Sequence, residues 1–500
     1  MKQLFYLSLA FLAITGCRKI EMDGEKELVI VTKEVAPVGV VSKTITLSGR
    51  ITKDTTLFAK DVNYLSGIVY VASGATLTIE TGAKVQGKYS GSDVSTLVIA
   101  RGGKIVARGT ADNPVVFTSA SPNPQSGDWG GIVICGKAPV NTTFNGTASL
   151  LQVEGGVDNA TGDGLAGGTE PADNSGILSY VRIEYAGYAF QPDKEINSLT
   201  MAAVGSGTTI DHIQVAYAKD DAFEWFGGTV NCKYLIAYKT QDDDFDSDNG
   251  YSGYVQFGIS LRDSAIADIS KSEAFESDNN SGGSTATPFT SAVFSNMTAI
   301  GPRVSLYGTG NSLFLAGAHI RRNTKISIMN SVFMGWPNAV LIDASTGIPV
   351  DKNIDDSTIR FRHNTLAGNG GLVAGVPTNV NAKYTVSSSA ATGKGDASIL
   401  SWIANNSFFG NSATVNAVDA KLIQPFNYNA FDATPYAGTA SPLAALLTFG
   451  VAGNYNYASN GNFTDPKLQD AFLKKVTFRG AIGLSGEDAT WWKGWTKWNY

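Results

Sequence analysis

The sequence predicts an all-β chain built as a solenoid of stacked coils. From Lys43 onward, apolar and polar residues alternate over short stretches that end at glycine or an Asx turn, as in GIVYVASGATLTIETGAKVQG from Gly67. A period of two is typical of strands, and no long segment has the period of 3.6 that predicts helices. A motif of acid, any residue, Phe and acid also recurs around Phe223, Phe245 and Phe275. Repeats at such spacings are typical of solenoids.

The first 17 residues have the pattern of a secretory signal that ends at a lipid-modified cysteine. Lys2 precedes an apolar run over residues 4–14, and small residues precede Cys17. This run is too short to span a bilayer. Because its ending, Ile-Thr-Gly-Cys, resembles the bacterial lipoprotein signal, we expect lipidation of Cys17 and anchoring to a membrane. Residues 18–42 are then predicted to form a flexible tether.

The body of the chain, residues 43–480, is predicted to hold the coils. LSYVRIEYAG, IDHIQVAYAKDD and NCKYLIAYKTQDDD each place apolar residues at alternate positions and end on a tyrosine. We expect matching positions to share core columns: Val181, Ile183 and Tyr185; Ile213, Val215 and Tyr217; Tyr234, Ile236 and Tyr238. ISIMNSVFMGW, IRFRHNTLAGNG and ILSWIANNSFFGN, the last from Ile399, continue the strand pattern and end in turns rich in Asn or Gly.

Loop insertions near 144–175, 385–397 and 433–462 interrupt the regular coils. Long loops that project from a rigid scaffold commonly carry binding function. Four of the eight tryptophans lie in the last 15 residues, within GEDATWWKGWTKWNY. We expect residues 481–500 to form an aromatic cap over the last coil, because a solenoid must cover its end, and a sugar-stacking platform is the alternative.

Composition narrows the classes of partner and cofactor. The chain has 44 acidic and 38 basic residues and no basic stripe, which argues against a nucleic-acid partner. Three histidines, His212, His319 and His363, show no ligand spacing and have no CxxC nearby, so the sequence does not predict a zinc site. Cys135 and Cys232 could form a disulfide in an oxidising compartment or remain two buried thiols, and we favour the thiols.

The recurrent acidic motif lies in a strongly negative stretch. Between Asp220 and Asp278 there are thirteen acidic residues and four basic ones. In a parallel solenoid, equivalent positions of adjacent coils are about 4.8 Å apart, so the motif predicts one ladder of phenylalanines and two of acids. The two acidic ladders supply the predicted metal ligands, which are Asp221, Glu224, Asp243, Asp246, Glu273 and Glu276. In a straight strand, strict alternation would place Asp221 on the same side as Phe223, and the two cannot both point into an apolar core. We therefore expect the motif to turn a corner and the acids to face solvent.

Three interpretations of these acids are open. They could be turn residues that satisfy backbone donors at the corners of the coils. They could bind Ca²⁺, which takes several carboxylate and carbonyl oxygens in flexible geometry. They could also be catalytic, since a glycosidase needs two carboxyl groups with unequal pKa values, although nothing in the sequence distinguishes one pair from the others.

The lipoprotein signal is followed by SGIVYVASGATLTIETGAKVQG, GTADNPVVFTS, DWGGIVICGKAPVN, DDAFEWFGGTVN and GAIGLSGEDATWWKGWTKW. Together they resemble a family of envelope lipoproteins from Bacteroidota-type bacteria, and the resemblance covers most of the chain. It implies a right-handed parallel β-helix, with no established activity or catalytic residues to transfer. The architecture is also distantly similar to that of pectate lyases and polygalacturonases, a likeness of fold that does not fix function.

We therefore expect a non-catalytic envelope lipoprotein, in the outer membrane and on the cell surface or its periplasmic face. It is expected to bind an extracellular glycan or an outer-membrane uptake receptor along an acidic, aromatic flank, with Ca²⁺ as a cofactor. A polysaccharide lyase or glycoside hydrolase on the same scaffold is the first alternative. A structural or adhesive surface protein is the second.

Overall fold

A computed structural model describes one compact unit of the chain. The described residues are 42–188, 195–302, 311–406 apart from 368, 371, 374–375, 378–381 and 387–392, and 461–500 apart from 484. The predicted signal peptide with Cys17, nearly all of the predicted tether and most of the 433–462 insertion lie outside these residues. Among the described helices, none is both long and apolar enough to cross a membrane.

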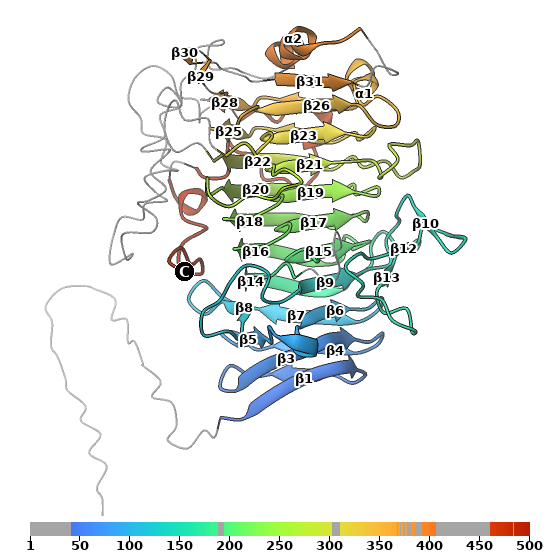
Figure 1. Cartoon of the computed structure of the whole chain (residues 1–500), viewed down its shortest axis with the longest axis vertical. Coiled ribbons are helices and arrows are strands. Elements are labelled where there is room, and N and C mark those ends of the chain that lie inside the picture. The colour runs from blue at the N-terminus through green and yellow to red at the C-terminus, as the bar shows by residue number, and fades with distance from the viewer. Residues whose placement is uncertain are drawn as a thin grey trace, which may run out of the picture. The chain divides into compact units, whose positions relative to one another are not determined.

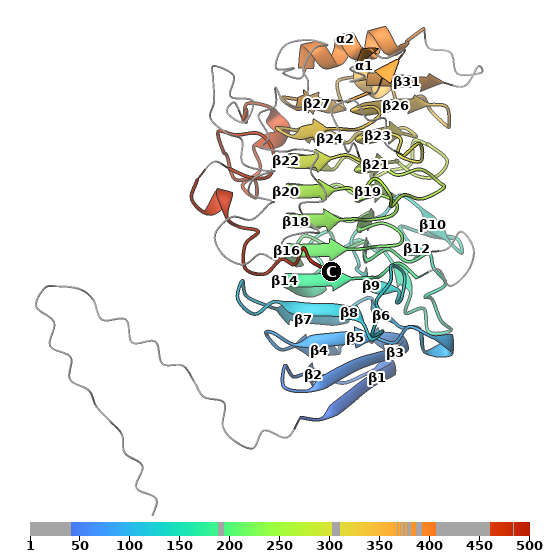
Figure 2. The ribbon, with the colours of Figure 1, turned by 60° about the vertical axis from the view of Figure 1, so that its left-hand side comes forward.

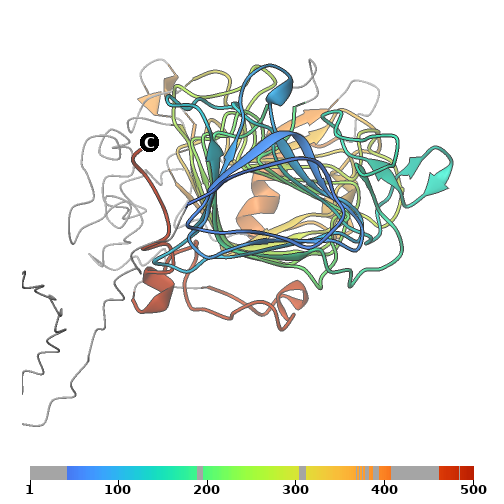
Figure 3. The same ribbon diagram turned by 90° about the horizontal axis from the view of Figure 1, so that it is seen from below.

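The described chain folds as a right-handed parallel β-helix, as the sequence predicts (Figure 1). Twenty-five strands hydrogen-bond into one continuous sheet whose pairings are parallel, and the view along the axis shows the coils enclosing a common interior (Figure 3). The sheet folds into three faces. β1 (Thr44–Ile51) and β3 (Val62–Val71) begin the stack and span the second and third faces.

The strands of each face follow one another coil by coil. The first face consists of β2 (Thr55–Leu57), β4 (Thr76–Ile79), β7 (Lys104–Arg108), β24 (Ser327–Met329), β27 (Arg360–Arg362) and the first halves of five longer strands. These longer strands are β14 (Gly176–Glu184), β16 (Thr209–Ala216), β18 (Cys232–Tyr238), β20 (Tyr254–Leu261) and β22 (Val293–Ile300). The second face consists of their second halves with β5 (Lys84–Gly87), β8 (Val115–Ser119), β25 (Val332–Met334) and β28 (Thr365–Ala367).

The third face carries the repeated Phe motif. Its strands are β6 (Thr96–Ile99), β9 (Gly131–Cys135), β15 (Leu199–Ala202), β17 (Phe223–Phe226), β19 (Phe245–Asp248), β21 (Phe275–Ser277), β23 (Ala318–Arg321), β26 (Val340–Ala344) and β31 (Ala382–Val386). The register pairs Phe223 with Phe245 and Phe245 with Phe275. All three side chains are buried, and their ring centroids lie 5.7 and 5.2 Å apart. The predicted phenylalanine ladder is therefore confirmed, including the rung after the longer step.

The corner between the first and second faces is a column of residues with left-handed backbone. Tyr180, His212, Tyr234 and Phe257 have φ values between 51° and 64°. This conformation costs roughly 1–2 kcal/mol per residue with a side chain. Their rings stack in sequence with centroid separations of 4.1, 4.4 and 5.3 Å, an arrangement that offsets part of this cost.

The structure corrects two parts of the predicted core columns. Tyr185 and Tyr217 have left-handed backbone and contact the Tyr500 ring instead of the main core. The corner column corrects the third set. Val181 pairs with Ile213, which pairs with Leu235 on the next coil. In the same way, Ile183 pairs with Val215, and Val215 pairs with Ala237. Tyr234, Ile236 and Tyr238 are therefore shifted by one position from the predicted columns. A slip of one residue turns every side chain of a strand to the opposite face. Ile236 and Tyr238 are buried in a separate cluster outside the coil.

The C-terminal segment supplies the other half of that outer cluster. We call residues 461–500 the C-terminal strap, because they run along the flank of the coils from β24 to β14 (Figure 2). Trp492, Trp495 and Trp498 are buried against Ile236 and Tyr238. The predicted aromatic segment thus covers apolar surface along the flank and not over the last coil.

Side-chain amides on three of the coils hold the strap in place. The Gln214 side chain bonds Lys497 through both its amide atoms, at 2.7 and 2.8 Å, and Gln256 bonds Lys474 in the same way. Further along, Asn296 donates to the Phe478 carbonyl at 2.9 Å. These side-chain amides pair with backbone N–H and C=O groups of the strap, which has no neighbouring strand to pair with there.

Helices interrupt the predicted all-strand body at its end. α1 is a single turn, Lys352–Asp355, whereas α2 spans Asp396–Asn406 and contacts β31 and β27. The prediction of a strand from Ile399 is wrong. Ile399 and Ile403 are four residues apart, lie on one side of α2 and are buried in the main core. A helix covers the open end of a coil without needing a further strand to pair with.

The 144–175 insertion forms two antiparallel hairpins between β9 and β14. They pair β10 (Thr143–Phe144) with β11 (Thr147–Ala148), and β12 (Leu151–Gln152) with β13 (Leu165–Ala166). A third small hairpin pairs β29 (Leu372–Val373) with β30 (Val376–Pro377). Cys135 and Cys232 are both free and buried, as we favoured.

Candidate cation-binding pocket

The outward side of the third face carries one column of charged residues. In β17, β19, β21 and β23 the residue after the inward-facing position points outward, and the register aligns Glu224, Asp246, Glu276 and His319 across the four strands. Three of these are predicted metal ligands. The ladder of Glu224, Asp246 and Glu276 is confirmed, and His319 extends it by one coil.

A second row of acids lies just before these strands. The Asp243 N–H donates to Oδ1 of Asp221 at 2.8 Å, and the Glu273 N–H donates to Oδ1 of Asp243 at 2.6 Å. Buried Ala222 lies at a bend between Asp221 and the strand. The motif does turn a corner, and two acids of this predicted ladder satisfy backbone donors of the next coil with one oxygen each.

Asp244 points the other way, into the coil. Its carboxylate accepts a hydrogen bond from Nη1 of Arg262 at 2.8 Å, and both side chains are 0% exposed. Oγ of Ser260 also donates to Asp244, and Nη2 of Arg262 donates to the Gln241 carbonyl at 3.1 Å. This inner ion pair fixes the corner from which Asp242 and Asp243 project outward.

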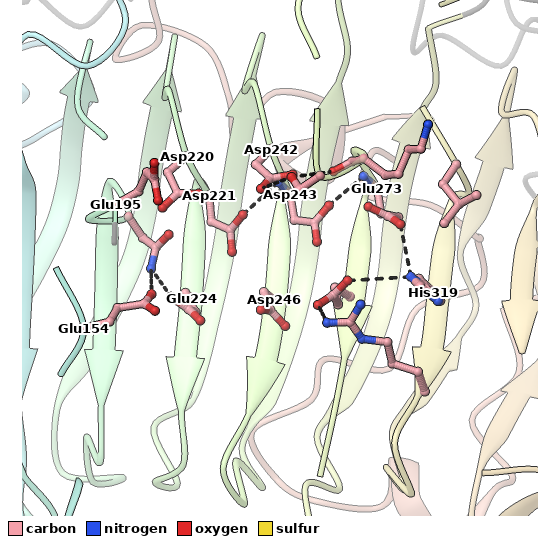
Figure 4. A pocket seen from close by; sticks show the side chains of 16 residues that line it. Glu154, Glu195, Asp220, Asp221, Glu224, Asp242, Asp243, Asp246, Glu273 and His319 are labelled. Carbon is pink, nitrogen blue, oxygen red and sulfur yellow. Dashed lines mark hydrogen bonds and ion pairs between the residues drawn. The ribbon is translucent and has the colours of Figure 1, made fainter. Parts of the chain in front are cut away.

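The two acidic rows line a pocket of about 300 Å³ (Figure 4). Ten carboxylates surround it, belonging to Glu154, Glu195, Asp220, Asp221, Glu224, Asp242, Asp243, Asp246, Glu273 and Glu276. The cationic groups among the lining residues are Lys271 and Arg321, with His319 at one end. The pocket therefore has a large excess of acidic groups.

The expectation that these acids face solvent is wrong. Asp221 is 7% exposed and Glu273 is 2% exposed. Glu154, which follows β12 in the hairpin insertion, and Glu195, before β15, form a wall beside the acidic rows. Because this wall comes from outside the repeat, the motif by itself could not show that the ladder is sheltered.

Burial sets the protonation of the pocket. It raises the pKa values of Asp221, Glu224 and Asp243 well above those of exposed carboxyl groups, and the charges of neighbouring carboxylates raise them further. For Asp242, burial and then the charge of Asp268 raise the pKa to about 8. Carboxylates in such a site need either protons or a bound cation at neutral pH.

The His319 end of the pocket is different in character. The His319 Nδ1 lies 3.1 Å from Oε1 of Glu273 and 3.6 Å from Oε2 of Glu276, and Nε2 lies 3.2 Å from Oδ2 of Asp343. Burial raises the pKa of Glu276, but the hydrogen bond with His319 and the charge of Arg321 outweigh it and hold that pKa below its usual value.

Three groups of side chains could each hold a metal ion, with ligand atoms within 4.8 Å of one another. They are Asp220, Asp221 and Asp242; Asp221, Glu224 and Asp246; and Glu273, Glu276 and His319. Five of the six predicted ligands belong to these groups. The sixth, Asp243, lines the same pocket.

Sequence reasoning missed several residues that line the pocket. His319 and Arg321 come from β23, where Ala318 replaces the phenylalanine of the motif. The segment AHIRR, residues 318–322, has the same alternation as FESDN, residues 275–279, with basic side chains in place of acidic ones. This match could have identified β23 as a further coil of the same face. Glu154 and Glu195 carry no such signal, because they lie outside the repeat.

A second cavity of about 400 Å³ adjoins the acidic pocket and shares Glu154 with it. Its lining mixes the aromatic rings of Phe144 and Phe226 with polar groups such as Gln152 and Asn249. The hairpins of the 144–175 insertion supply Phe144 and Gln152. A combination of ring faces and amides suits a ligand with both apolar and hydroxylated surfaces.

The stacked parallel coils agree with the result of a comparison with models of known protein families. The model of the pectate-lyase-like β-helix domain matches residues 49–407. The chain belongs to this β-helix family. No curated protein and no solved structure matches the chain. Membership of the pectate-lyase-like β-helix family accounts for the coils, and any activity has to be argued from the pocket.

Proposed function

We propose that the protein is a non-catalytic, lipid-anchored outer-membrane protein that binds Ca²⁺ in the acidic pocket and an extracellular glycan along the same face. The observation that carries the proposal is the sheltered excess of carboxylates. Ten line the pocket, and within the described part of the chain the buried Oδ1 atom of half-buried Asp246 has no hydrogen-bond partner. A buried carboxylate oxygen calls for a partner, and a bound cation would supply one.

Ca²⁺ suits these ligands better than Mg²⁺ does. Ca²⁺ accepts six to eight oxygens in flexible geometry, whereas Mg²⁺ demands a near-ideal octahedron. The group of Asp221, Glu224 and Asp246 offers oxygens only, from two adjacent coils. A divalent ion there relieves the repulsion between the acids, which is roughly 3–4 kcal/mol per pair at about 4.8 Å and an effective dielectric of 20.

The neighbouring cavity supports a glycan as the ligand. Phe144 and Phe226 offer ring surfaces next to the amide groups of Gln152 and Asn249, and the shared Glu154 places this cavity directly beside the acidic pocket. The alternative partner, an outer-membrane uptake receptor, would be recovered by pulldown from envelope extracts. A glycan array with and without Ca²⁺ tests the glycan proposal, and binding that requires both Ca²⁺ and Phe226 would support it.

Thermal unfolding tests the Ca²⁺ site. Millimolar Ca²⁺ should raise the melting temperature of the wild type and chelator should lower it, with Mg²⁺ less effective. The double variant Asp243→Asn and Asp246→Asn should lose this response. An asparagine at 243 keeps the oxygen that accepts from the Glu273 N–H, so the coil contact survives.

The matched control is Asp112→Asn with Asp356→Asn, which removes two exposed charges away from the pocket. It should respond to Ca²⁺ like the wild type. A wild type with no Ca²⁺ shift beyond ionic-strength screening, together with a pocket variant that is more stable than the wild type without Ca²⁺, would identify the acids as turn residues only.

A polysaccharide hydrolase or lyase on the same face is the second candidate. The observation in its favour is that Asp246 and Glu276 are neighbours in register with opposite pKa shifts. A glycosidase needs such a pair, one carboxyl group protonated and the other ionised. New reducing ends or unsaturated products from a bound glycan would replace the binding proposal with this one, and binding with no product at all would reject it.

A further inference from the structure

We propose that the His319 end of the pocket is a second metal site, selective for a borderline transition ion such as Zn²⁺, with His319, Glu273 and Glu276 as its ligands. This site is separate from the Ca²⁺ site proposed above. It also reverses the expectation from the sequence, in which the histidines show no ligand spacing.

The ligand atoms have the spacing of a small coordination sphere. Oε1 of Glu273 and Oε2 of Glu276 lie 3.1 and 3.6 Å from the same ring nitrogen, Nδ1 of His319. Ligands of a tetrahedral Zn²⁺ ion at bond lengths of about 2.0–2.1 Å are about 3.3 Å from one another. The two distances bracket this value, so an ion in place of the Nδ1 proton requires only small shifts of the side chains.

The surroundings orient all three ligands. Nε2 of His319 lies 3.2 Å from the carboxylate of Asp343, whose Oδ1 accepts from the Ser345 N–H at 2.8 Å. Histidine ligands of metals commonly donate their other ring N–H to a carboxylate in this way, which fixes the tautomer and aims the free nitrogen at the ion. Asp343 is therefore a positioning residue.

Arg321 does not block the site. Its guanidinium binds Oε1 of Glu276 and donates from Nε to Asp278 at 2.9 Å. The other oxygen of Glu276, Oε2, is the one that faces His319. Glu276 can thus bind a metal through one oxygen while Arg321 holds the second.

The donor types separate the two sites in the pocket. Asp221, Glu224 and Asp246 offer only oxygens, which favours Ca²⁺. The imidazole nitrogen of His319 favours Zn²⁺ and similar ions, for which nitrogen is a common ligand, over Ca²⁺. Three protein ligands also leave a coordination position open towards the pocket, as catalytic zinc sites do.

Calorimetric titration of chelator-treated, full-length protein with Zn²⁺ in excess Ca²⁺ tests the proposal. The wild type should bind one Zn²⁺, and Co²⁺ in its place should give visible absorption typical of a low-coordinate site. His319→Gln should weaken Zn²⁺ binding at least 100-fold. Asp343→Ala should weaken it about 10- to 100-fold while keeping the Co²⁺ spectrum, because the ligands themselves are unchanged.

Two controls make the result specific. His363→Gln removes a partly exposed histidine outside the pocket and should bind Zn²⁺ like the wild type. The variant Asp243→Asn with Asp246→Asn should lose the Ca²⁺ response and keep Zn²⁺ binding. If His319→Gln fails to fold, Glu273→Gln replaces it as the ligand variant with the same expected loss.

Two results would contradict the proposed Zn²⁺ site. Absence of Zn²⁺ binding to the wild type, or equal binding to the wild type and His319→Gln, would overturn the proposal and leave His319 as the centre of a structural ion-pair network. Zn²⁺ binding that depends on His319 in a protein with no Ca²⁺ response would instead refute the Ca²⁺ part of the proposed function and support this second site.

Discussion

The buried ion pair between Asp244 and Arg262 holds the corner that presents Asp242 and Asp243 to the pocket. Both side chains are 0% exposed, and Nη1 of Arg262 lies 2.8 Å from Oδ1 of Asp244. At this distance the attraction is about 6 kcal/mol at an effective dielectric of 20, much of which offsets the desolvation of the two charges. Arg262→Met removes the attraction and leaves the desolvated carboxylate alone.

We expect Arg262→Met to lower the free energy of unfolding by about 3–5 kcal/mol, the range for breaking one partner of a buried pair. Urea unfolding at pH 8 measures this loss. Adding Asp244→Asn removes the unpaired charge and should recover more than half of the loss, because a neutral amide can still accept from Oγ of Ser260.

The loss should also depend on pH. Burial raises the pKa of Asp244 even beside Arg262, and removing the guanidinium raises it further. The folded variant then binds a proton that the unfolded chain, with an ordinary carboxyl pKa, releases, so its stability falls as pH rises. The deficit of Arg262→Met relative to the wild type should be smaller at pH 5 than at pH 8. A loss below about 1 kcal/mol, or an equal loss at both pH values, would show that the pair is hydrated and does not hold the corner.

Three further predictions follow from the sequence and the fold. A fatty-acid analogue should label the wild type in cells and not Cys17→Ser, and equal labelling of both would exclude lipidation at this residue. Ile183→Asp should destabilise the coils by several kcal/mol, since it buries an unpaired charge, whereas Ile236→Asp should first release the C-terminal strap. Limited proteolysis tests this difference, which equal cleavage of residues 461–500 in the two variants would contradict. Because burial raises the pKa of Asp242 to about 8, far above the unfolded value of about 4, stability of the chelator-treated protein should fall from pH 5 to pH 8. Melting curves with and without Ca²⁺ check this, and a melting temperature that rises with pH in chelator would contradict it.

The stacked coils and two of their ladders follow from the amino-acid sequence alone. Period-two alternation selects strands, and a repeat of nearly one coil length aligns equivalent residues whatever the rest of the chain does. This logic predicted the stack of Phe223, Phe245 and Phe275 and the acids beside them, and it held even where a longer loop separates the third copy.

The direction in which residues at the corners point, and the segments that cover them, depend on contacts between distant parts of the chain. Because Tyr234 occupies a left-handed turn within β18, the alternation of inward and outward side chains shifts by one residue after it, and Ile236 faces outward. No local sequence pattern shows such a shift. Likewise, Glu154 and His319 reach the acidic pocket from an insertion and from a coil without the Phe motif. Burial, and with it the protonation and metal preference of the acids, depends on these long-range neighbours. The repeat fixes the spacing of the carboxylates, but only the fold fixes the dielectric and the partners that surround them.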